Sequence, residues 1–364
     1  MVQFTNLVVL GIASFSSLVV AHPGEDHHAE AAARAAYFQS NSLHSRSIGS
    51  CLSSSLKARG YEAQNVARRE ATLQKIRQAR GLTSISNKYL QARDFDTLLN
   101  TTHHSNQTGL TASTDPEILF HSNGTCVLSE DVTQGPYYVT GELIRNNLVE
   151  NQEGVPLYLD IQLVDSSTCE PVSEVYLDAW HCNATGVYSG VVANGNGNTN
   201  DLSNLNTTFL RGVQKTGEDG VVQFQTIFPG HYTGRAIHIH VLSHPANETT
   251  VYANGTISGL YSSHVSHIGQ LFFDQDLISV VEETNPYSTN TQTLTENADD
   301  WILKQEADNG IDPFVEYVFL GDDISDGIFG WISVVINTSE DTTVTPAAEY
   351  TADGGEANDN SQPF

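Results

Sequence analysis

Positively charged side chains are scarce in this sequence. The 364 residues include 16 lysines and arginines against 43 aspartates and glutamates, which gives a formal net charge of −27. A nucleic-acid partner requires a basic surface that faces the phosphates, so this composition argues against one. Eleven of the 16 cations lie between residues 22 and 94, which leaves five for residues 95–364. Arg235 is one of those five, and a cation this scarce favours a functional role over a purely solvated position at the surface.

Long apolar segments are lacking beyond the first 20 residues. The run at residues 7–20 is too short and too rich in serine to span a bilayer, and it ends at a plausible cleavage point after Ala21. We therefore expect a signal peptide at residues 1–21, a secreted protein and no membrane partner. Eight glycosylation sequons support export: Asn100, Asn106, Asn123, Asn183, Asn206, Asn247, Asn254 and Asn337.

Cysteines are few, and in a secreted chain four of them suggest two disulfides. Cys169 and Cys182 flank what reads as one extended strand, so a direct bond between them is geometrically awkward. We expect each of them to pair with Cys51 or Cys126.

The composition divides the chain into four parts. After the signal peptide, residues 22–115 read as a helical arm and a linker, with helices near residues 29–37 and 63–80. Within this arm, Arg68-Arg69 is either a processing site or a basic pair on a helix face, and His22, His27 and His28 are either a flexible tip or a copper site. Residues 116–339 read as a single domain rich in β-strands. Residues 340–364 hold six acids and no base, which predicts a disordered acidic tail.

Residues 116–339 are dominated by short segments in which apolar and polar side chains alternate. This period of two predicts strands, and their even spacing predicts an all-β fold built as an antiparallel β-sandwich. The expected strands cover residues 157–163, 175–180, 221–228, 235–242, 269–273, 314–320 and 331–336, with one helix at 298–306.

One segment at residues 228–244, with the sequence F-P-G-H-Y-T-G-R-A-I-H-I-H-V-L-S-H, indicates a metal site. His238 and His240 are two residues apart on a predicted strand, so both imidazoles face the same side and can bind one ion. Tyr232 follows the Pro-Gly turn and could fold back as a third ligand, and Tyr188 ends an earlier strand. Two phenolate oxygens and two imidazoles suit ferric iron better than zinc or cuprous copper.

These residues resemble the intradiol ring-cleavage dioxygenases, the family of catechol, hydroxyquinol and protocatechuate dioxygenases. The resemblance covers about residues 118–335 and is strongest to secreted members. It rests on D-A-W-x8-Y at residues 178–188 and P-G-x-Y-x-x-R-x-x-H-x-H at residues 229–240. Two further matching segments are G-P-Y-Y at residues 135–138 and G-Q-L-F-F at residues 269–273.

The resemblance implies a non-haem ferric ion held by Tyr188, Tyr232, His238 and His240. It also implies that a small aromatic diol is cleaved with dioxygen between its two hydroxylated carbons, to give a muconate-type diacid. In this scheme Tyr232 helps to take up a proton, Arg235 stabilises developing negative charge, and Gln270 stands near the reacting oxygen. Tyr138 is expected to line the substrate pocket, as is His267 because it lies close to Gln270 in the sequence.

The chain departs from the family pattern beside the arginine. Ala236 replaces the usual proline, and the bulky segment before Arg235 is shortened to Thr233-Gly234. The N-terminal arm does not match the dimerisation helices of intracellular members, so the resemblance predicts no oligomeric state. The alternative reading is a glycosylated extracellular β-sandwich module that has lost catalysis, which oxygen uptake with catechols would exclude.

Overall fold

The computed structural model describes residues 60–82, 135, 137–193, 195–197, 200–257, 264–265, 267–308, 312–339 and 342–358. The predicted signal peptide, the predicted helix at residues 29–37 and the histidines near the start of the arm lie outside these residues. The described residues are mostly strands with few helices, so the predicted β-rich fold is confirmed.

One four-stranded sheet has the order β5-β2-β10-β9. β2 pairs with β5 and β9 pairs with β10 in antiparallel fashion, whereas β2 and β10 run parallel over nine residue pairs. The prediction of a purely antiparallel arrangement is therefore wrong for this sheet. β2 and β10 are joined by a long crossover that contains the other large sheet, and such a connection permits parallel pairing where a hairpin does not. The bounds are β2 (Pro156–Asp165), β5 (Val221–Ile227), β9 (Glu316–Phe319) and β10 (Ile328–Ile336).

The second four-stranded sheet has the order β4-β3-β6-β8, and all its pairs are antiparallel, as predicted. Three of these strands were predicted from the sequence and β4 was not, because its glycine and three long polar side chains give a weak strand pattern. The bounds are β3 (Val175–Trp180), β4 (Arg211–Lys215), β6 (His238–Pro245) and β8 (His267–Phe272).

Both large sheets contribute side chains to one hydrophobic core. Alternate residues of β2, such as Leu157, Leu159 and Ile161, cluster with Ile239 and Val241 of β6. Burying such side chains contributes on the order of 1.5–3 kcal/mol each, which favours the register that keeps them inside. The side chains of β6 that alternate with Ile239 and Val241 therefore face away from this core.

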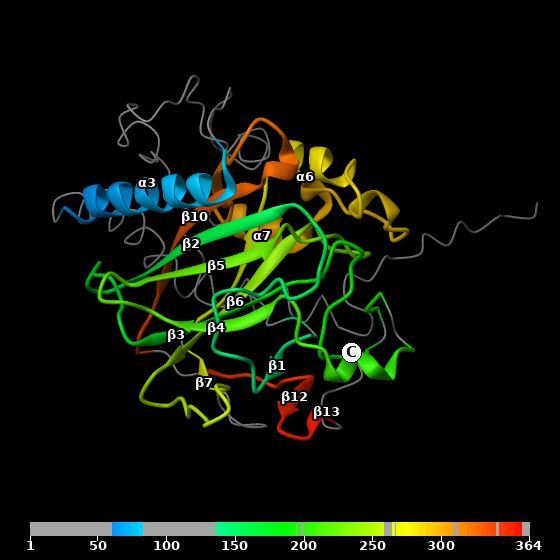
Figure 1. Ribbon diagram of the computed structural model, residues 1–364. Helices are drawn as coiled ribbons and strands as arrows, with labels where there is room; N and C mark the ends of the chain where they lie inside the picture. Colours follow the sequence, from blue (N-terminus) through cyan, green and yellow to red (C-terminus); the bar gives the residue numbers. More distant parts are fainter. Residues whose placement is uncertain are drawn as a thin grey trace, which may run out of the picture.

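Helix α3 (Tyr61–Arg80) covers the outer face of the sheet that contains β2 and β10 (Figure 1). Its buried Val66 and Leu73 pack against a cluster from β9, β10 and the turn between them: Val318, Leu320, Phe329 and Trp331. Arg68 and Arg69 both contact Asp160 of β2, with Arg68 Nη2 2.7 Å from Asp160 Oδ1. The predicted helix at residues 63–80 is confirmed, and the paired arginines are held against the sheet rather than displayed for processing.

The remaining helices lie beside the two sheets at one end of the molecule (Figure 1). Helix α7 begins three residues later than predicted, and the sequence analysis missed α6, an eight-residue helix that buries Leu277, Ile278 and Val281. The bounds are α6 (Gln275–Glu282) and α7 (Trp301–Asp308), with 3-10 turns η2 (Leu202–Asn206), η3 (Tyr287–Thr289), η4 (Asn297–Asp299) and η5 (Ile324–Asp326).

The predicted disordered tail is wrong for residues 342–358, which form three short strands. β12 pairs with β1, and the Ala347 N–H donates to the Tyr138 carbonyl at 2.8 Å. The charge count concealed both the turn before Gly354, which has a positive φ of 116°, and the apolar residues Val344 and Ala348, which become buried. The bounds are β1 (Val139–Thr140), β7 (His264–Val265), β11 (Thr342–Thr343), β12 (Ala348–Thr351) and β13 (Gly354–Ala357).

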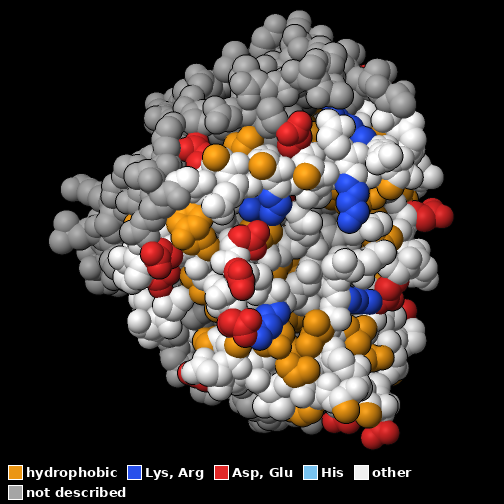
Figure 2. Space-filling view, turned by 60° about the vertical axis from the view of Figure 1, so that its left-hand side comes forward, with side chains coloured by type: hydrophobic (Ala, Val, Ile, Leu, Met, Phe, Trp, Pro, Cys, Tyr) orange, Lys and Arg blue, Asp and Glu red, His pale blue; other side chains and the backbone are white. Residues whose placement is uncertain are grey.

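On the face drawn in Figure 2, lysine and arginine side chains lie singly, most of them near acidic or neutral polar side chains. Two cations of the described residues have acidic partners: Arg145 pairs with Glu150, and Lys215 pairs with Glu174. Within the described residues, no helix combines the length and apolar character that crossing a membrane would need.

Candidate metal and substrate site

Strand β6 presents its two histidines on the face that points away from the shared core. Ile237, Ile239 and Val241 belong to that core, as the alternation predicts. On the opposite face, His240 lies between Trp180 of β3 and Gln270 of β8 as directly paired residues. Antiparallel neighbours in register have their side chains on one side, so the sheet itself gathers these groups.

The hydrogen bond of His238 fixes how it faces the site. Its Nδ1 lies 2.7 Å from the Ala236 carbonyl, which can only accept, so Nδ1 carries the hydrogen. In the neutral ring Nε2 then offers a lone pair, and it lies 3.0 Å from His240 Nε2. The His240 ring stacks on Trp180 with centroids 4.8 Å apart and planes within 5°. A carbonyl bond that sets the tautomer is the usual preparation of a metal-binding imidazole.

Gly135 contacts His240 and restricts where its ring can lie. A Cβ placed on Gly135 would come 2.7 Å from His240 Cε1, and the residue has a φ of +73°. This glycine opens the G-P-Y-Y segment noted in the sequence. Its place beside the imidazole gives a physical reason for a glycine there.

Tyr232 lies in the loop between β5 and β6. Its hydroxyl oxygen is 3.4 Å from His238 Nε2, so the side chain does fold back onto the histidine pair. The loop packs tightly at Gly230, where a Cβ would overlap the Ala184 carbonyl group. The Cys182 thiol also donates to the Gly230 carbonyl, at 3.1 Å.

Tyr188 reaches the same place from the loop after β3. Its ring centroid lies 5.5 Å from that of Tyr232 and 6.1 Å from that of His240. The side-chain amide of Asn196 binds the Tyr188 backbone twice. Its Oδ1 accepts from the Tyr188 N–H at 2.8 Å, and its Nδ2 donates to the Tyr188 carbonyl at 2.9 Å. The Tyr188 hydroxyl is buried and has no well-formed hydrogen bond within the described residues. A buried polar atom left in this state marks a place where a further ligand completes the site.

Burial dominates the acidity of both phenols. It raises the pKa of Tyr188, with a further increase from the neighbouring Tyr232, and it likewise raises the pKa of Tyr232. Without a metal ion in the site, both hydroxyls therefore keep their protons at neutral pH. Their ionisation would require a strongly charged partner.

Arg235 is fully buried and held in place by Asp300. Its Nε lies 2.8 Å from Asp300 Oδ2, and its Nη2 donates to Gln270 Oε1 at 2.6 Å. Burial lowers the pKa of Arg235, but the charge and hydrogen bond of Asp300 act together with the neighbouring Tyr232 and Tyr188 and raise this pKa above its ordinary value. Because the amide oxygen of Gln270 accepts from Arg235, its NH2 group is left as the donor on the remaining side.

The sequence analysis missed Asp300. Its carboxylate accepts hydrogen bonds from Ile302 N and Leu303 N at 3.0 Å and 2.9 Å, so it caps α7 while it binds Arg235. The available signal was an aspartate near the start of the predicted helix, because aspartate is a frequent helix cap. Asp300 also accepts from the Ala236 N–H at 2.8 Å, a bond that the family's usual proline could not donate.

The two predicted pocket residues lie elsewhere. Tyr138 packs behind Trp180, with centroids 5.3 Å apart, whereas its neighbour Tyr137 lies 4.8 Å from Tyr188. Consecutive side chains of an extended segment point to opposite sides, so Tyr137 takes the place expected for Tyr138. His267 pairs with Ser243 on the core side of the sheet, because it is three residues from Gln270 and therefore faces the other way.

The cysteine prediction holds only in part. Cys169 is disulfide-bonded, but Cys182 is a free, buried thiol, so the predicted disulfide at Cys182 is wrong. Cys182 sits in the hydrophobic cluster around the phenols, among Tyr137, Tyr188 and Tyr232. Its role there is packing and the bond to Gly230.

Among the described residues, no group of three or more His, Cys, Asp or Glu side chains could hold a metal. The two histidines and the two tyrosines predicted as ligands lie close together in the described part of the chain. All four side chains are buried.

Comparisons with known proteins agree on one kind of enzyme. The family model described as "Dioxygenase" matches residues 133–298. An intradiol ring-cleavage dioxygenase from Tetranychus urticae is 32% identical to this chain, over 59% of this chain and 96% of that one, with a TM-score of 0.46. No curated protein matches the chain.

More distant solved structures carry related descriptions. The dioxygenase domain of a dioxygenase–carbohydrate-binding protein fusion from Streptomyces sp. SirexAA-E is 24% identical, over 57% of this chain and 97% of that one, with a TM-score of 0.33. A 3-chlorocatechol 1,2-dioxygenase from Rhodococcus opacus 1CP is 16% identical, over 58% of this chain and 73% of that one, with a TM-score of 0.34.

Proposed function

The chain belongs to the intradiol ring-cleavage dioxygenase family, and from this premise we propose that it cleaves catechol-type aromatics between their two hydroxylated carbons. Dioxygen is the second substrate, and a muconate-type diacid is the product. We further propose that a non-haem ferric ion is the cofactor and that the site lies on the outer face of one sheet of a β-sandwich. The family supports the reaction in general, and the donor set of this chain supports the metal.

The convergence of Tyr188, Tyr232, His238 and His240 is the observation that carries this proposal. Two phenol oxygens and two imidazole nitrogens suit a hard trivalent ion such as ferric iron. The residues present fit such an ion, because His238 directs an Nε2 lone pair at the site and the Tyr188 hydroxyl is buried without a well-formed bond. When bound, the ferric ion would hold both substrate oxygens and make the ring electron-rich enough to react with dioxygen.

The other residues act on the substrate and its protons. Tyr232 lies closest to the histidine pair and would accept a proton from the incoming diol once its own oxygen is ionised. Arg235 supplies a fixed positive charge where negative charge develops on the ring, and Asp300 holds the guanidinium still. Gln270 would offer its NH2 group to a reacting oxygen, since Arg235 occupies its amide oxygen.

We also propose that the protein is secreted. The apolar leader at residues 1–21 and the eight sequons support this proposal. The disulfide at Cys169 is consistent with an oxidising compartment. Recovery of glycosylated protein from the culture medium of a eukaryotic host, lacking residues 1–21, would test it.

An oxygen-uptake assay on protein of measured iron content tests the function. We expect one iron per chain, a visible phenolate-to-iron charge-transfer band that shifts when catechol is added, and oxygen consumption with at least one of catechol, hydroxyquinol, protocatechuate or their alkylated and chlorinated forms. Tyr232→Phe and His238→Ala should abolish turnover. Iron-loaded protein that is colourless, or undiminished turnover in either variant, would refute the ligand assignment.

A further inference from the structure

The two phenolic residues of the site depend on loops, whereas the two histidines depend on a strand. His238 and His240 are held by the paired backbone of β6. Tyr188 and Tyr232 lie outside the strands, in loops that approach each other where Gly230 abuts Ala184. A metal held by all four side chains therefore requires something that fixes one loop relative to the other.

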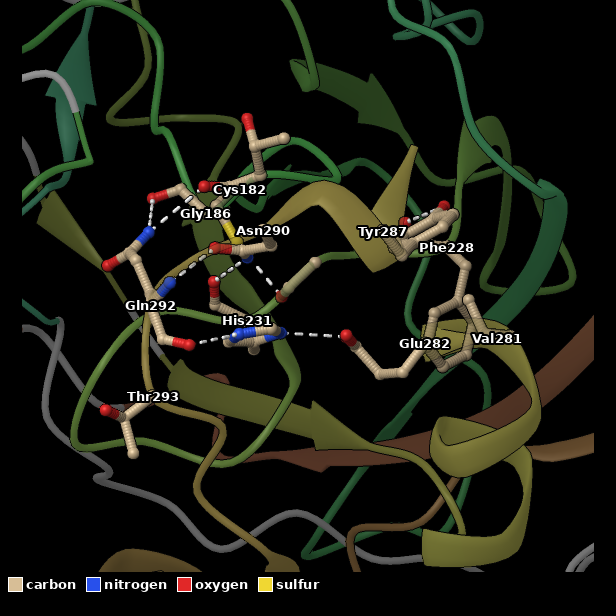
Figure 3. Close-up of polar contacts among 12 residues, drawn as sticks. Cys182, Gly186, Phe228, His231, Val281, Glu282, Tyr287, Asn290, Gln292 and Thr293 are labelled. Carbon is tan, nitrogen blue, oxygen red and sulfur yellow. Dashed lines mark hydrogen bonds and ion pairs between the residues drawn. The ribbon is translucent and has the colours of Figure 1, made fainter. Parts of the chain in front are cut away.

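Gln292 contacts both of these loops. Its side-chain Nε2 donates to the carbonyls of Thr185 and Gly186, at 3.0 Å and 3.3 Å, just before Tyr188. Its Oε1 lies 3.4 Å from the backbone nitrogen of Thr233, just after Tyr232. One amide group thus spans the two segments that carry the phenols, and Figure 3 shows its contacts on the Gly186 side.

The backbone around Gln292 strengthens the second of these contacts. The Gln292 carbonyl accepts from His231 Nε2 at 3.0 Å, and Asn290 Nδ2 donates to the His231 carbonyl at 2.8 Å. Glu282 holds the other ring nitrogen of His231, with its Oε1 2.9 Å from Nδ1 (Figure 3). His231 precedes Tyr232, so its backbone and both ring nitrogens are fixed beside the predicted ligand.

The Tyr188 loop is shaped to receive this glutamine. A Cβ on Gly186 would overlap the Gln292 amide, and Gly186 has a φ of +79°. A Cβ on Gly197 would come 3.1 Å from Gln292 Nε2. Glycine at close backbone approaches is expected where another group must come near.

We propose that Gln292 is a positioning residue that sets the separation of Tyr188 and Tyr232 by tying their two loops together. The side-chain hydrogen bonds of Gln292 all go to the loop backbone, so it acts through the loops and not on substrate. The requirement is for a donor and an acceptor at the end of one side chain of this length. Glutamate would place an oxygen against two carbonyl oxygens, and leucine would contact neither loop through a hydrogen bond.

The consequence for the metal rests on the proposed function, so the experiment reads out both parts. Gln292→Glu keeps the shape and removes the donor, and Gln292→Leu removes donor and acceptor. Gln214→Leu is the matched control, because it removes a glutamine bond to the Gln223 carbonyl on neighbouring strands that do not carry the phenols. Iron content, the visible charge-transfer band, the rate of iron loss to a chelator, kcat, KM and melting temperature are measured for each.

We expect both Gln292 variants to bind iron with a shifted and weaker charge-transfer band, to release iron roughly 10–100-fold faster, and to lose kcat more than they change KM. The control should keep the wild-type band and release rate even if its melting temperature falls. Wild-type band position and release rate in both Gln292 variants would overturn the proposal. Should Gln292→Leu fail to fold, the isosteric Gln292→Glu decides.

Hydrogen exchange on the metal-free protein separates this proposal from the proposed function. Loss of the tie should speed exchange in the peptides that cover residues 184–190 and 230–235, with the control unchanged. Wild-type protein without an iron band, combined with faster exchange in Gln292→Glu, would reject the metal and retain the tie. Unchanged exchange in both Gln292 variants would reject the tie, whatever the wild-type enzyme does.

Discussion

Two arginine–aspartate pairs with buried carboxylates occupy the outer faces of the two large sheets. The two carboxylates differ in the groups that donate hydrogen bonds to them. Asp160 beneath α3 receives Arg68 through two bonds, Arg69 at 3.5 Å and the Gln223 amide at 2.7 Å. Asp300 receives a single arginine and completes its hydrogen bonding with backbone N–H groups, among them that of Ala236. In the first arrangement, side chains from α3 and β5 surround the carboxylate and so join a helix to a sheet, while Arg68 Nη1 also donates to Asn65 Oδ1 within α3.

In the second arrangement, Asp300 binds one side of the Arg235 guanidinium and another residue binds the other side. Arg235 uses that side to bind the amide oxygen of Gln270 on β8. The same two residue types therefore serve adhesion at one face and charge placement at the other. The difference lies in the donors around each carboxylate: side chains surround Asp160, whereas one arginine and several backbone N–H groups surround Asp300.

Removal of Asp300 should have the largest effect. Asp300→Ala leaves Arg235 buried without its ion-pair partner, and breaking a buried pair from one side costs about 3–5 kcal/mol. Urea unfolding at pH 7 measures this loss. Asp299→Ala is the control, because its side chain is exposed one residue away. A loss below about 1 kcal/mol would show that the pair is not what holds Arg235.

A methyl group on Gly135 should act on the site alone. Gly135→Ala presses on His240 Cε1 and should weaken iron binding by about 10–100-fold, the usual effect of displacing a group that orients a ligand. Gly255→Ala is a matched control, since its φ is +84° and a Cβ there meets nothing within 4 Å. Equal iron affinity in the two variants would mean that backbone strain, and not the histidine, determines the result.

Arg68→Met should weaken the adhesive pair without touching the chemistry. Hydrogen bonds to charged groups contribute about 1.5–3 kcal/mol, and Arg69 and Gln223 still cover Asp160, so we expect a loss of about 2 kcal/mol in unfolding free energy. The charge-transfer band and kcat should stay at wild-type values. Arg80→Met, at the exposed end of α3, should change neither quantity. A spectral change in Arg68→Met would show that the two faces are coupled.

The smallest effect concerns His267, on the core side of the sheet that carries the site. Burial lowers its pKa to about 3 from an ordinary value of 6.5, and neither ring nitrogen has a hydrogen-bond partner within the described residues. A lowered pKa means that stability is complete above pH 6.5 and falls as the pH drops below it, because the unfolded state binds the proton first. Between pH 7 and 5.5 wild type should therefore lose about 1 kcal/mol more than His267→Leu.

Unfolding in urea at the two pH values tests this prediction, with kcat of the variant as the second measurement. A pH-independent difference between wild type and His267→Leu would contradict the burial of a neutral ring. A large fall in kcat would instead restore His267 to the site.

Patterns with a short period were readable from the sequence. The alternation around His238 and His240 identified the strand, its core side and the opposite side that carries both histidines, because a strand has only two faces. Even so, the strand begins at His238 and not at the predicted residue 235, since Arg235 and Ala236 turn towards Asp300.

Features that depend on distant partners were not readable. Asp300 joins Arg235 across 65 residues, and Gln292 reaches back 107 residues to Thr185 and 59 residues to Thr233, so local pattern could not pair them. Tyr138 was assigned to the pocket by the family resemblance and His267 by its proximity to Gln270 in the sequence, and in an extended chain a shift of one or three positions reverses the side. The tail was misjudged because its acidic count outweighed a few apolar residues that find a partner in β1.

That pairing has a consequence for how the enzyme matures. β12 holds β1 and the Tyr138 carbonyl from a point about 200 residues later in translation, and the preceding residue, Tyr137, touches Tyr188. A nascent chain still short of residue 342, or a product clipped there by a protease, would carry every donor of the site yet lack the wall behind them. The wall behind the donors is therefore complete only once residues 347–351 are present.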